Sequence, residues 1–158
     1  MIEQYKIIDH YLSRDEWTYW WDYVQYVATY KAGEKDHEFA DEVGMVHELD
    51  INNLNTFPKN IYGSKLHRAY INCYAPRELA YFHEDSEDPD AYTMLYYPCP
   101  EYDIDEGGAT ELILDNKIVG IMSKPNRLLT FKSNVTHRAT PFNSFKRYTV
   151  ALKYTTGF

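Results

Sequence analysis

The stretch YAPRELAYFHED, residues 74–85, decides the fold of this sequence, and its last three residues are His83, Glu84 and Asp85. Residues two apart on an extended segment point to the same side. His83 and Asp85 are therefore predicted to present an imidazole and a carboxylate to the same ion. A His-x-Asp step is a weak signal alone, so its meaning depends on residues farther along the chain.

Two later residues complete the pattern. His137 lies downstream, and Arg147 comes ten positions later at the start of the segment RYTVALKY. Two imidazoles and one carboxylate on one face of a metal leave the opposite face open, which is the arrangement of non-haem Fe(II) oxygenases. Plain structural interpretations also exist. His83 and Asp85 could belong to an exposed acidic loop, His137 could be a hydrogen-bonded strand histidine, and Arg147 could be a surface charge.

In this order and spacing, the four residues resemble the Fe(II)/2-oxoglutarate-dependent dioxygenase superfamily, in particular its prolyl-4-hydroxylase-like branch. The resemblance covers roughly residues 7–154. It implies a mainly β fold, a double-stranded β-helix (jelly roll) with an N-terminal helix packed on the larger sheet. It also implies that residues 1–158 form a single dioxygenase domain.

The resemblance further implies the cofactors and the catalytic residues. Fe(II) is expected on His83, Asp85 and His137, with 2-oxoglutarate as co-substrate, O2 as oxidant and ascorbate as an optional reductant. Arg147 is expected to hold the C5 carboxylate of 2-oxoglutarate, because a guanidinium offers a planar bidentate fork.

Three further residues are expected to bind the co-substrate. Tyr74 matches the tyrosine that precedes the His-x-Asp step in the prolyl-hydroxylase-like branch. Tyr97, in the segment LYYP, matches a tyrosine that bonds the C5 carboxylate, although a core aromatic is an equal alternative. Thr149 shares the predicted inward face of the last strand with Arg147 and Lys153, while residues 148, 150, 152 and 154 face the outer helix. The Gly107-Gly108 pair resembles a family turn in which glycines let the backbone pass close to the site.

The implied reaction is hydroxylation of an unactivated C–H bond with release of succinate and CO2, and a prolyl residue is the leading substrate. The match departs from the branch at Arg77, where a glycine is expected, at Ala80, and at Lys153, where a tryptophan is common. Lys153 could contact an acidic group of a different substrate or could extend its ammonium into water. Two alternatives therefore stay open: the same chemistry on a free amino acid or other small metabolite, and a non-catalytic jelly-roll module that binds a metal or ligand.

Charge and composition limit the possible partners. The 158 residues carry a net charge of −8, which argues against a nucleic-acid backbone as partner. Residues 83–115 hold eleven acids and no Lys or Arg, whereas residues 116–158 hold eight Lys or Arg and no acid. The two segments could neutralise each other in the fold, or the acids could form a rim that attracts a cationic substrate.

Cys73 and Cys99 are expected to be buried thiols. With no signal peptide or membrane span visible, we expect a cytoplasmic protein.

The remaining pattern predicts one helix followed by many short strands. Residues 5–10 read as a strand, and Ser13 with Glu16 forms a capping box for a helix that Gly33 ends. Residues 34–59 read as polar and irregular, with His37 and His47 as surface or structural histidines. Further strands are predicted at 66–74, 92–97, 110–114, 117–122, 127–131, 136–139 and 147–154.

Overall fold

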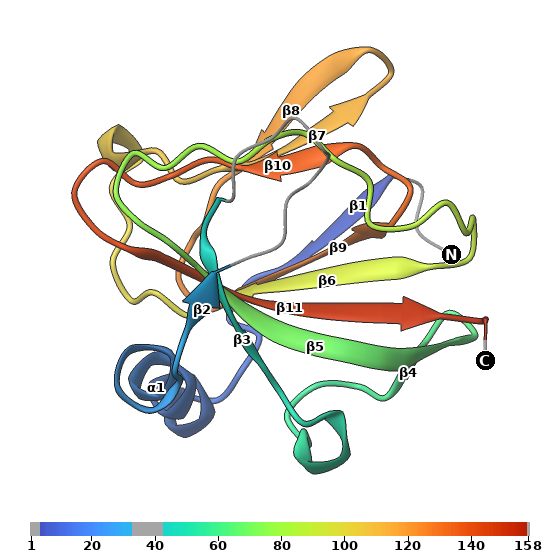
Figure 1. The fold of residues 1–158 in the computed structure, drawn as a ribbon, viewed down its shortest axis with the longest axis horizontal. Helices are drawn as coiled ribbons and strands as arrows, with labels where there is room; N and C mark the ends of the chain where they lie inside the picture. Colours follow the sequence, from blue (N-terminus) through green and yellow to red (C-terminus); the bar gives the residue numbers. More distant parts are fainter. Residues whose placement is uncertain (1–3, 33–42, 158) are drawn as a thin grey trace.

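The computed structural model describes residues 4–32 and 43–157, which form a mainly β structure with one α-helix (Figure 1). The strands are β1 (Tyr5–Ile8), β2 (Lys31–Ala32), β3 (Met45–Glu48), β4 (Asn60–Ile61), β5 (Ser64–Tyr74), β6 (Tyr92–Tyr97), β7 (Thr110–Leu114), β8 (Lys117–Ile121), β9 (Arg127–Lys132), β10 (His137–Ala139) and β11 (Arg147–Thr155). The helices are α1 (Arg14–Asp22), which continues as the π-helical turn η1 (Tyr23–Val27), and the short 3-10 helices η2 (Ile51–Asn53) and η3 (Ile104–Glu106).

Two antiparallel sheets make up the structure. The larger sheet has the order β1-β9-β6-β11-β5-β3-β2, with β4 paired to the start of β5, and the smaller sheet has the order β10-β7-β8. Strands distant in sequence are neighbours in both sheets, since β11 lies between β5 and β6, and β10 lies beside β7. Figure 1 shows the smaller sheet lying across from the larger one, while α1 lies beyond the opposite face of the larger sheet.

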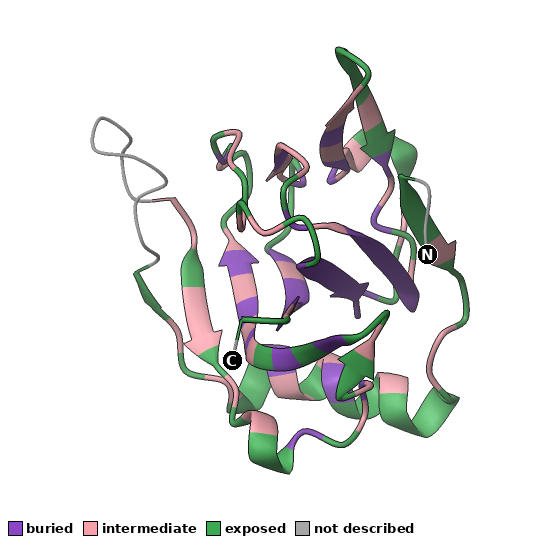
Figure 2. Cartoon of the chain, turned by 90° about the vertical axis from the view of Figure 1, so that its right-hand side faces the viewer, coloured by how far each residue is buried: buried purple, intermediate pink, exposed green. Residues whose placement is uncertain are grey.

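The alternation along β11 explains this layering. Val150, Leu152 and Tyr154 are fully buried and pack in one hydrophobic cluster with Trp20 and Val24 of the helical segment. The residues between them point to the other face, toward the smaller sheet. The predicted division of this strand into a helix-facing side and an inward side is confirmed, and Figure 2 shows that the strands in the middle of the molecule are largely buried.

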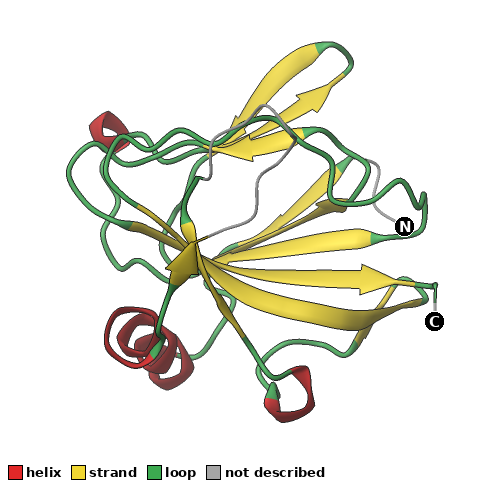
Figure 3. Cartoon of the chain, viewed as in Figure 1, coloured by secondary structure: helices red, strands yellow, loops and turns green. Residues whose placement is uncertain are grey.

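The helix begins as predicted but ends earlier. Ser13 caps it, with its Oγ accepting a hydrogen bond from the backbone N–H of Glu16 at 3.2 Å. The helical segment stops at Val27, and Ala28 is already extended, so Gly33, which lies outside the described residues, does not end it. The chain leaves the helix early because β2 joins the sheet by pairing with β3 (Figure 3).

The segment predicted to be irregular contains a strand. β3 pairs with β5, and its His47 contacts the backbone oxygen of Thr29 through Nδ1 at 2.9 Å and the hydroxyl of Tyr23 through Nε2 at 3.2 Å. His47 is therefore a structural histidine, as predicted, while His37 lies outside the described residues. Cys73 and Cys99 are buried free thiols. Among the described helices, none is long and apolar enough to cross a membrane.

Candidate metal centre and co-substrate cavity

A backbone bridge brings the two candidate histidines together. The N–H of His83 donates to the carbonyl of His137 at 3.0 Å, and the reverse hydrogen bond measures 2.9 Å. Their rings are consequently neighbours, with centroids 4.4 Å apart. His83 belongs to no strand: β5 ends at Tyr74, and the loop that follows carries His83 to the edge of the smaller sheet.

Asp85 completes a cluster of three potential metal ligands. His83 Nε2 lies 3.2 Å from Asp85 Oδ1, and His137 Nε2 lies 3.3 Å from Oδ2. One ligand atom from each residue falls within 4.8 Å of the others. The Nδ1 atoms of the histidines contact the carbonyls of Tyr81 and Val135 at 3.1 and 2.8 Å, which favours the tautomer with a proton on Nδ1 and a lone pair on Nε2. This donor set could hold Fe(II) and suits it chemically.

The second oxygen of Asp85 is fixed by its own partners. Thr93 donates its hydroxyl to Asp85 Oδ2 at 2.7 Å and also contacts the hydroxyl of Ser133, and the Lys153 ammonium forms an ion pair with the same oxygen. Burial raises the pKa of Asp85, but Lys153 and the imidazoles lower it by more, so its pKa lies well below the ordinary value. Burial lowers the pKa of Lys153, but Tyr70 and Asp85 raise it above the ordinary value. The Lys153 ammonium therefore neutralises Asp85, and its side chain, 12% exposed, also lines the cavity.

Arg147 lies buried in the same interior with neutral partners only. It is 2% exposed, and its Nε donates to the carbonyl of Gly108 at 3.1 Å. Its two terminal nitrogens donate to the hydroxyls of Thr149 at 3.1 Å and Thr110 at 2.9 Å. No carboxylate among the described residues forms an ion pair with it, and burial lowers the pKa of its guanidinium. A buried charge is costly without a counter-charge, so this end of the interior favours an anionic ligand.

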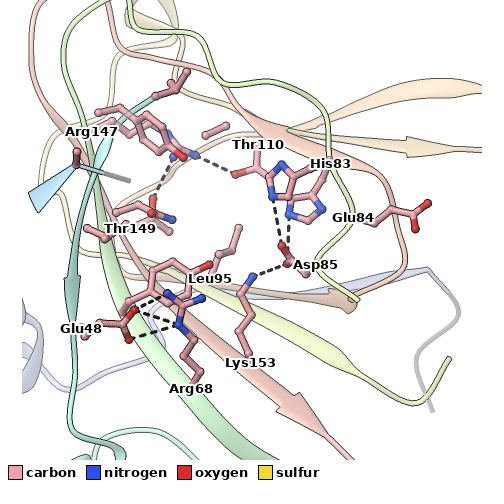
Figure 4. Close-up of a pocket in the computed structure, with 18 of the residues that line it drawn as sticks. Glu48, Arg68, His83, Glu84, Asp85, Leu95, Thr110, Arg147, Thr149 and Lys153 are labelled. Atoms are coloured by element: carbon pink, nitrogen blue, oxygen red, sulfur yellow. Dashed lines mark hydrogen bonds and ion pairs between the residues drawn. The ribbon is translucent and has the colours of Figure 1, made fainter. Parts of the chain in front are cut away.

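One cavity of about 350 Å³ joins the histidine–aspartate cluster to Arg147 (Figure 4). Tyr74 and Thr149 line it as well, whereas Tyr97 does not. The Tyr97 side chain is 1% exposed, and its hydroxyl lies 2.6 Å from Thr110 Oγ1. Tyr97 therefore braces the threonine that holds Arg147, and its ring centre lies 5.7 Å from the guanidinium carbon of Arg147.

The cavity also contains residues that the sequence did not single out. Thr110 follows the Gly107-Gly108 pair, and the resemblance of that pair to a family turn could have identified Thr110 as a site residue. Glu48 and Arg68 also line the cavity. Glu48 lies in a segment that reads as irregular, and nothing in the pattern of the predicted strand 66–74 marks Arg68 as a site residue. Arg77 and Tyr81 are exposed and do not line it, and Ala80 is buried.

The glycine turn before β7 is required by space and by backbone angle. Gly108 has φ +80°, and a Cβ there would lie 2.2 Å from a ring carbon of Phe142. The turn aims the Gly108 carbonyl at Arg147. At Arg77, where the motif of the prolyl-hydroxylase-like branch has glycine, φ is +66°. The chain therefore keeps a left-handed backbone conformation at a residue whose side chain disfavours it.

Solved structures match the chain, although no protein-family model and no curated protein sequence does. A prolyl-4-hydroxylase of Pseudomonas putida has 13% identity and a TM-score of 0.73, covering 96% of this chain and 92% of its own. A viral collagen prolyl hydroxylase of Paramecium Bursaria Chlorella virus-1, in complex with 2-oxoglutarate, has 14% identity and a TM-score of 0.67, covering 98% and 97%. HygX of Streptomyces hygroscopicus, bound to nickel, 2-oxoglutarate and hygromycin B, has 9% identity and a TM-score of 0.69, covering 98% and 84%.

These neighbours define the class of fold. The chain has the fold of the 2-oxoglutarate-Fe(II) oxygenases, prolyl hydroxylases among them, and at these identities the likeness concerns the fold alone. The resemblance predicted from the sequence is confirmed at this level.

Proposed function

We propose that the chain is an Fe(II)- and 2-oxoglutarate-dependent dioxygenase that hydroxylates an unactivated C–H bond. The observation that carries the proposal is the single cavity that joins the His83–Asp85–His137 cluster to Arg147. A dicarboxylate with a 2-oxo group needs both features, a metal for one end and a buried cation for the other. The proposal includes one domain over residues 1–158, with the two sheets forming a double-stranded β-helix.

Each part of the cavity has a defined task in this reaction. His83, Asp85 and His137 would hold Fe(II), which when bound supplies the activation of O2 that converts 2-oxoglutarate and a C–H substrate into succinate, CO2 and an alcohol. Arg147 and Thr149 would bind the C5 carboxylate, the first through its planar fork. Tyr74 lines the same cavity and would flank the co-substrate, and ascorbate would serve as an external reductant where iron oxidises.

Two substrate classes are compatible with the neighbours. The prolyl hydroxylases support a prolyl residue, and a neighbour from Trichoplax adhaerens was solved with a hypoxia-inducible-factor peptide fragment. HygX was solved with the small molecule hygromycin B, which supports the small-metabolite alternative. A nucleic acid remains unexpected on charge grounds.

The test is an anaerobic titration. Fe(II) is added to the metal-free protein, then 2-oxoglutarate, and the weak visible charge-transfer band of the chelated pair is monitored. We expect the band in the wild type and in Asp22→Ala, which removes an exposed carboxylate from α1, and its loss in Asp85→Ala. Iron binding without any band would instead favour the non-catalytic metal-binding module.

A further inference from the structure

An ion pair on the inner face of the larger sheet has no role in the proposed chemistry. Arg68 of β5 donates through Nε to Glu48 Oε1 of β3 at 3.1 Å, with a second hydrogen bond from Nη2. Glu48 is the register partner of Tyr70, two residues from Arg68, and all three side chains line the cavity. The pair therefore faces the site and not the outer surface of the sheet.

A short chain of contacts connects this ion pair to the candidate metal centre. The Arg68 guanidinium lies 4.4 Å from the centre of the Tyr70 ring, and the Lys153 nitrogen lies 5.7 Å from the same centre. Lys153 in turn pairs with Asp85. A molecule held at the ion pair can extend across Tyr70 toward Asp85. Figure 4 shows Arg147, Asp85 and the Glu48–Arg68 pair at three separate corners, so such a molecule does not need the place of the co-substrate.

The exposure of the pair allows it to exchange partners. The side chains of Glu48 and Arg68 are 43% and 42% exposed, and ion pairs this accessible contribute little to stability. A guanidinium binds a carboxylate through two parallel hydrogen bonds, and a carboxylate binds an ammonium equally directly. A free α-amino acid carries both groups on one carbon, whereas a residue inside a peptide carries neither.

The size of the cavity is sufficient for a substrate of this class. About 350 Å³ lies near the lower limit for small-molecule sites, and in the proposed function it also holds the co-substrate. We propose that the Glu48–Arg68 pair binds the α-ammonium and the α-carboxylate of a free amino acid and directs its side chain over Tyr70 to the metal. This inference rests on the proposed function and names its substrate class.

The first experiment measures binding to the Fe(II)- and 2-oxoglutarate-loaded protein without oxygen. Loading is verified by the charge-transfer band, so its failure counts against the proposed function and not against the amino-acid site. The common free L-amino acids are then screened by ligand-observed NMR, beside their N-acetyl and carboxamide derivatives and a proline-containing peptide. We expect at least one free amino acid to bind, and each blocked derivative to bind at least about tenfold more weakly, since each lacks one charged hydrogen-bonding group.

Substitutions then test the two charges. Glu48→Gln and Arg68→Gln are each expected to raise the amino-acid Kd at least about tenfold. Asp9→Asn is the matched control, because Asp9 pairs with Arg127 away from the cavity and its side chain is 44% exposed, close to the value for Glu48. Its amino-acid Kd should equal that of the wild type.

A charge exchange separates recognition from structural support. The double variant E48R/R68E keeps an ion pair between β3 and β5 but reverses its polarity, so a bound amino acid is turned away from the metal. We expect amino-acid-dependent succinate formation to stay lost in this double variant. If the pair were merely structural, the double variant would restore succinate formation. A band-positive protein that binds no free amino acid, or that binds the peptide and the blocked derivatives as well as the free form, would overturn the proposal.

Discussion

Replacement of Lys153 by Met offers a sharp test of how the candidate metal centre is held together without metal. The change keeps the unbranched side chain, one atom shorter, but removes the ammonium from Asp85, whose side chain is 9% exposed. Two unit charges about 4 Å apart interact by about 4 kcal/mol at an effective dielectric constant of about 20. Removing one partner of a buried pair costs about 3–5 kcal/mol in general. Because Thr93 still bonds Asp85, we expect about 3 kcal/mol, a fall in Tm of about 6–12 °C for a chain of this size.

The assay is thermal unfolding after chelation of metal, at neutral pH. Lys117→Met is the control, because Lys117 is exposed on β8 and the same substitution there leaves no buried charge. Adding Mn(II) should raise the Tm of Lys153→Met more than that of the wild type, since the metal supplies the missing positive charge. The reasoning is refuted if the two lysine variants unfold together, or if the loss at Lys153 does not respond to metal.

The contribution of Asp85 to folding stability depends on pH with a definite sign. The pKa of Asp85 is lower in the folded protein than in the unfolded chain, so its ionisation stabilises the fold above the unfolded pKa of about 4, and this contribution is lost as the pH falls through the folded value. In Lys153→Met the folded pKa rises. The difference in stability between the two proteins should therefore be full at neutral pH and narrow in acid, where a protonated carboxyl no longer needs the ammonium.

Three further predictions concern Arg147 and the turns. Arg147→Lys keeps the charge but loses the planar fork, so the charge-transfer titration should need at least about tenfold more 2-oxoglutarate. Arg138→Lys is the control. An unchanged titration would show that Arg147 does not bind the co-substrate. Gly108→Ala should lower the free energy of unfolding in urea by at least about 2 kcal/mol, because its Cβ meets Phe142. Gly63→Ala, at φ +81° with open space around it, should lower it by only about 1 kcal/mol. Equal losses would mean that the backbone angle alone determines the cost of each substitution. Arg77→Gly should gain up to about 1 kcal/mol in the same assay by relieving φ +66°, and a loss would show that the arginine side chain stabilises its turn.

Much of the fold could be predicted because its central strands carry strong local patterns. β6 and β7 have the predicted bounds, and β11 has the predicted faces, since the order of apolar and polar residues along a strand is a property of the sequence itself. β3 could not be predicted, because MVHE shows no alternation and its strand conformation depends on pairing with β5. The end of the helix was missed for a similar reason: the pairing of β2 with β3, distant in sequence, determines it.

The candidate site, like the fold, could be predicted only in part from the sequence. The order of His83, Asp85, His137 and Arg147 predicted residues that the fold does bring to one cavity. Several partners of these residues could not be predicted, because their contacts join segments far apart in sequence. The Lys153–Asp85 ion pair spans 68 positions, and Arg147 lies 37 positions from its partner Thr110.

The backbone bridge between His83 and His137 has a consequence for how the site can open. Each of these residues donates a main-chain hydrogen bond to the other, so their side chains cannot separate while the bridge holds. Detachment of the loop that carries His83 from the edge of the smaller sheet would therefore dismantle the ligand set in one event. A bound ion would tie both segments from the side-chain end, and the amide hydrogens of these two histidines would then exchange with solvent more slowly. The two segments would then be linked twice, once by the main-chain hydrogen bonds and once by the ion that their side chains hold.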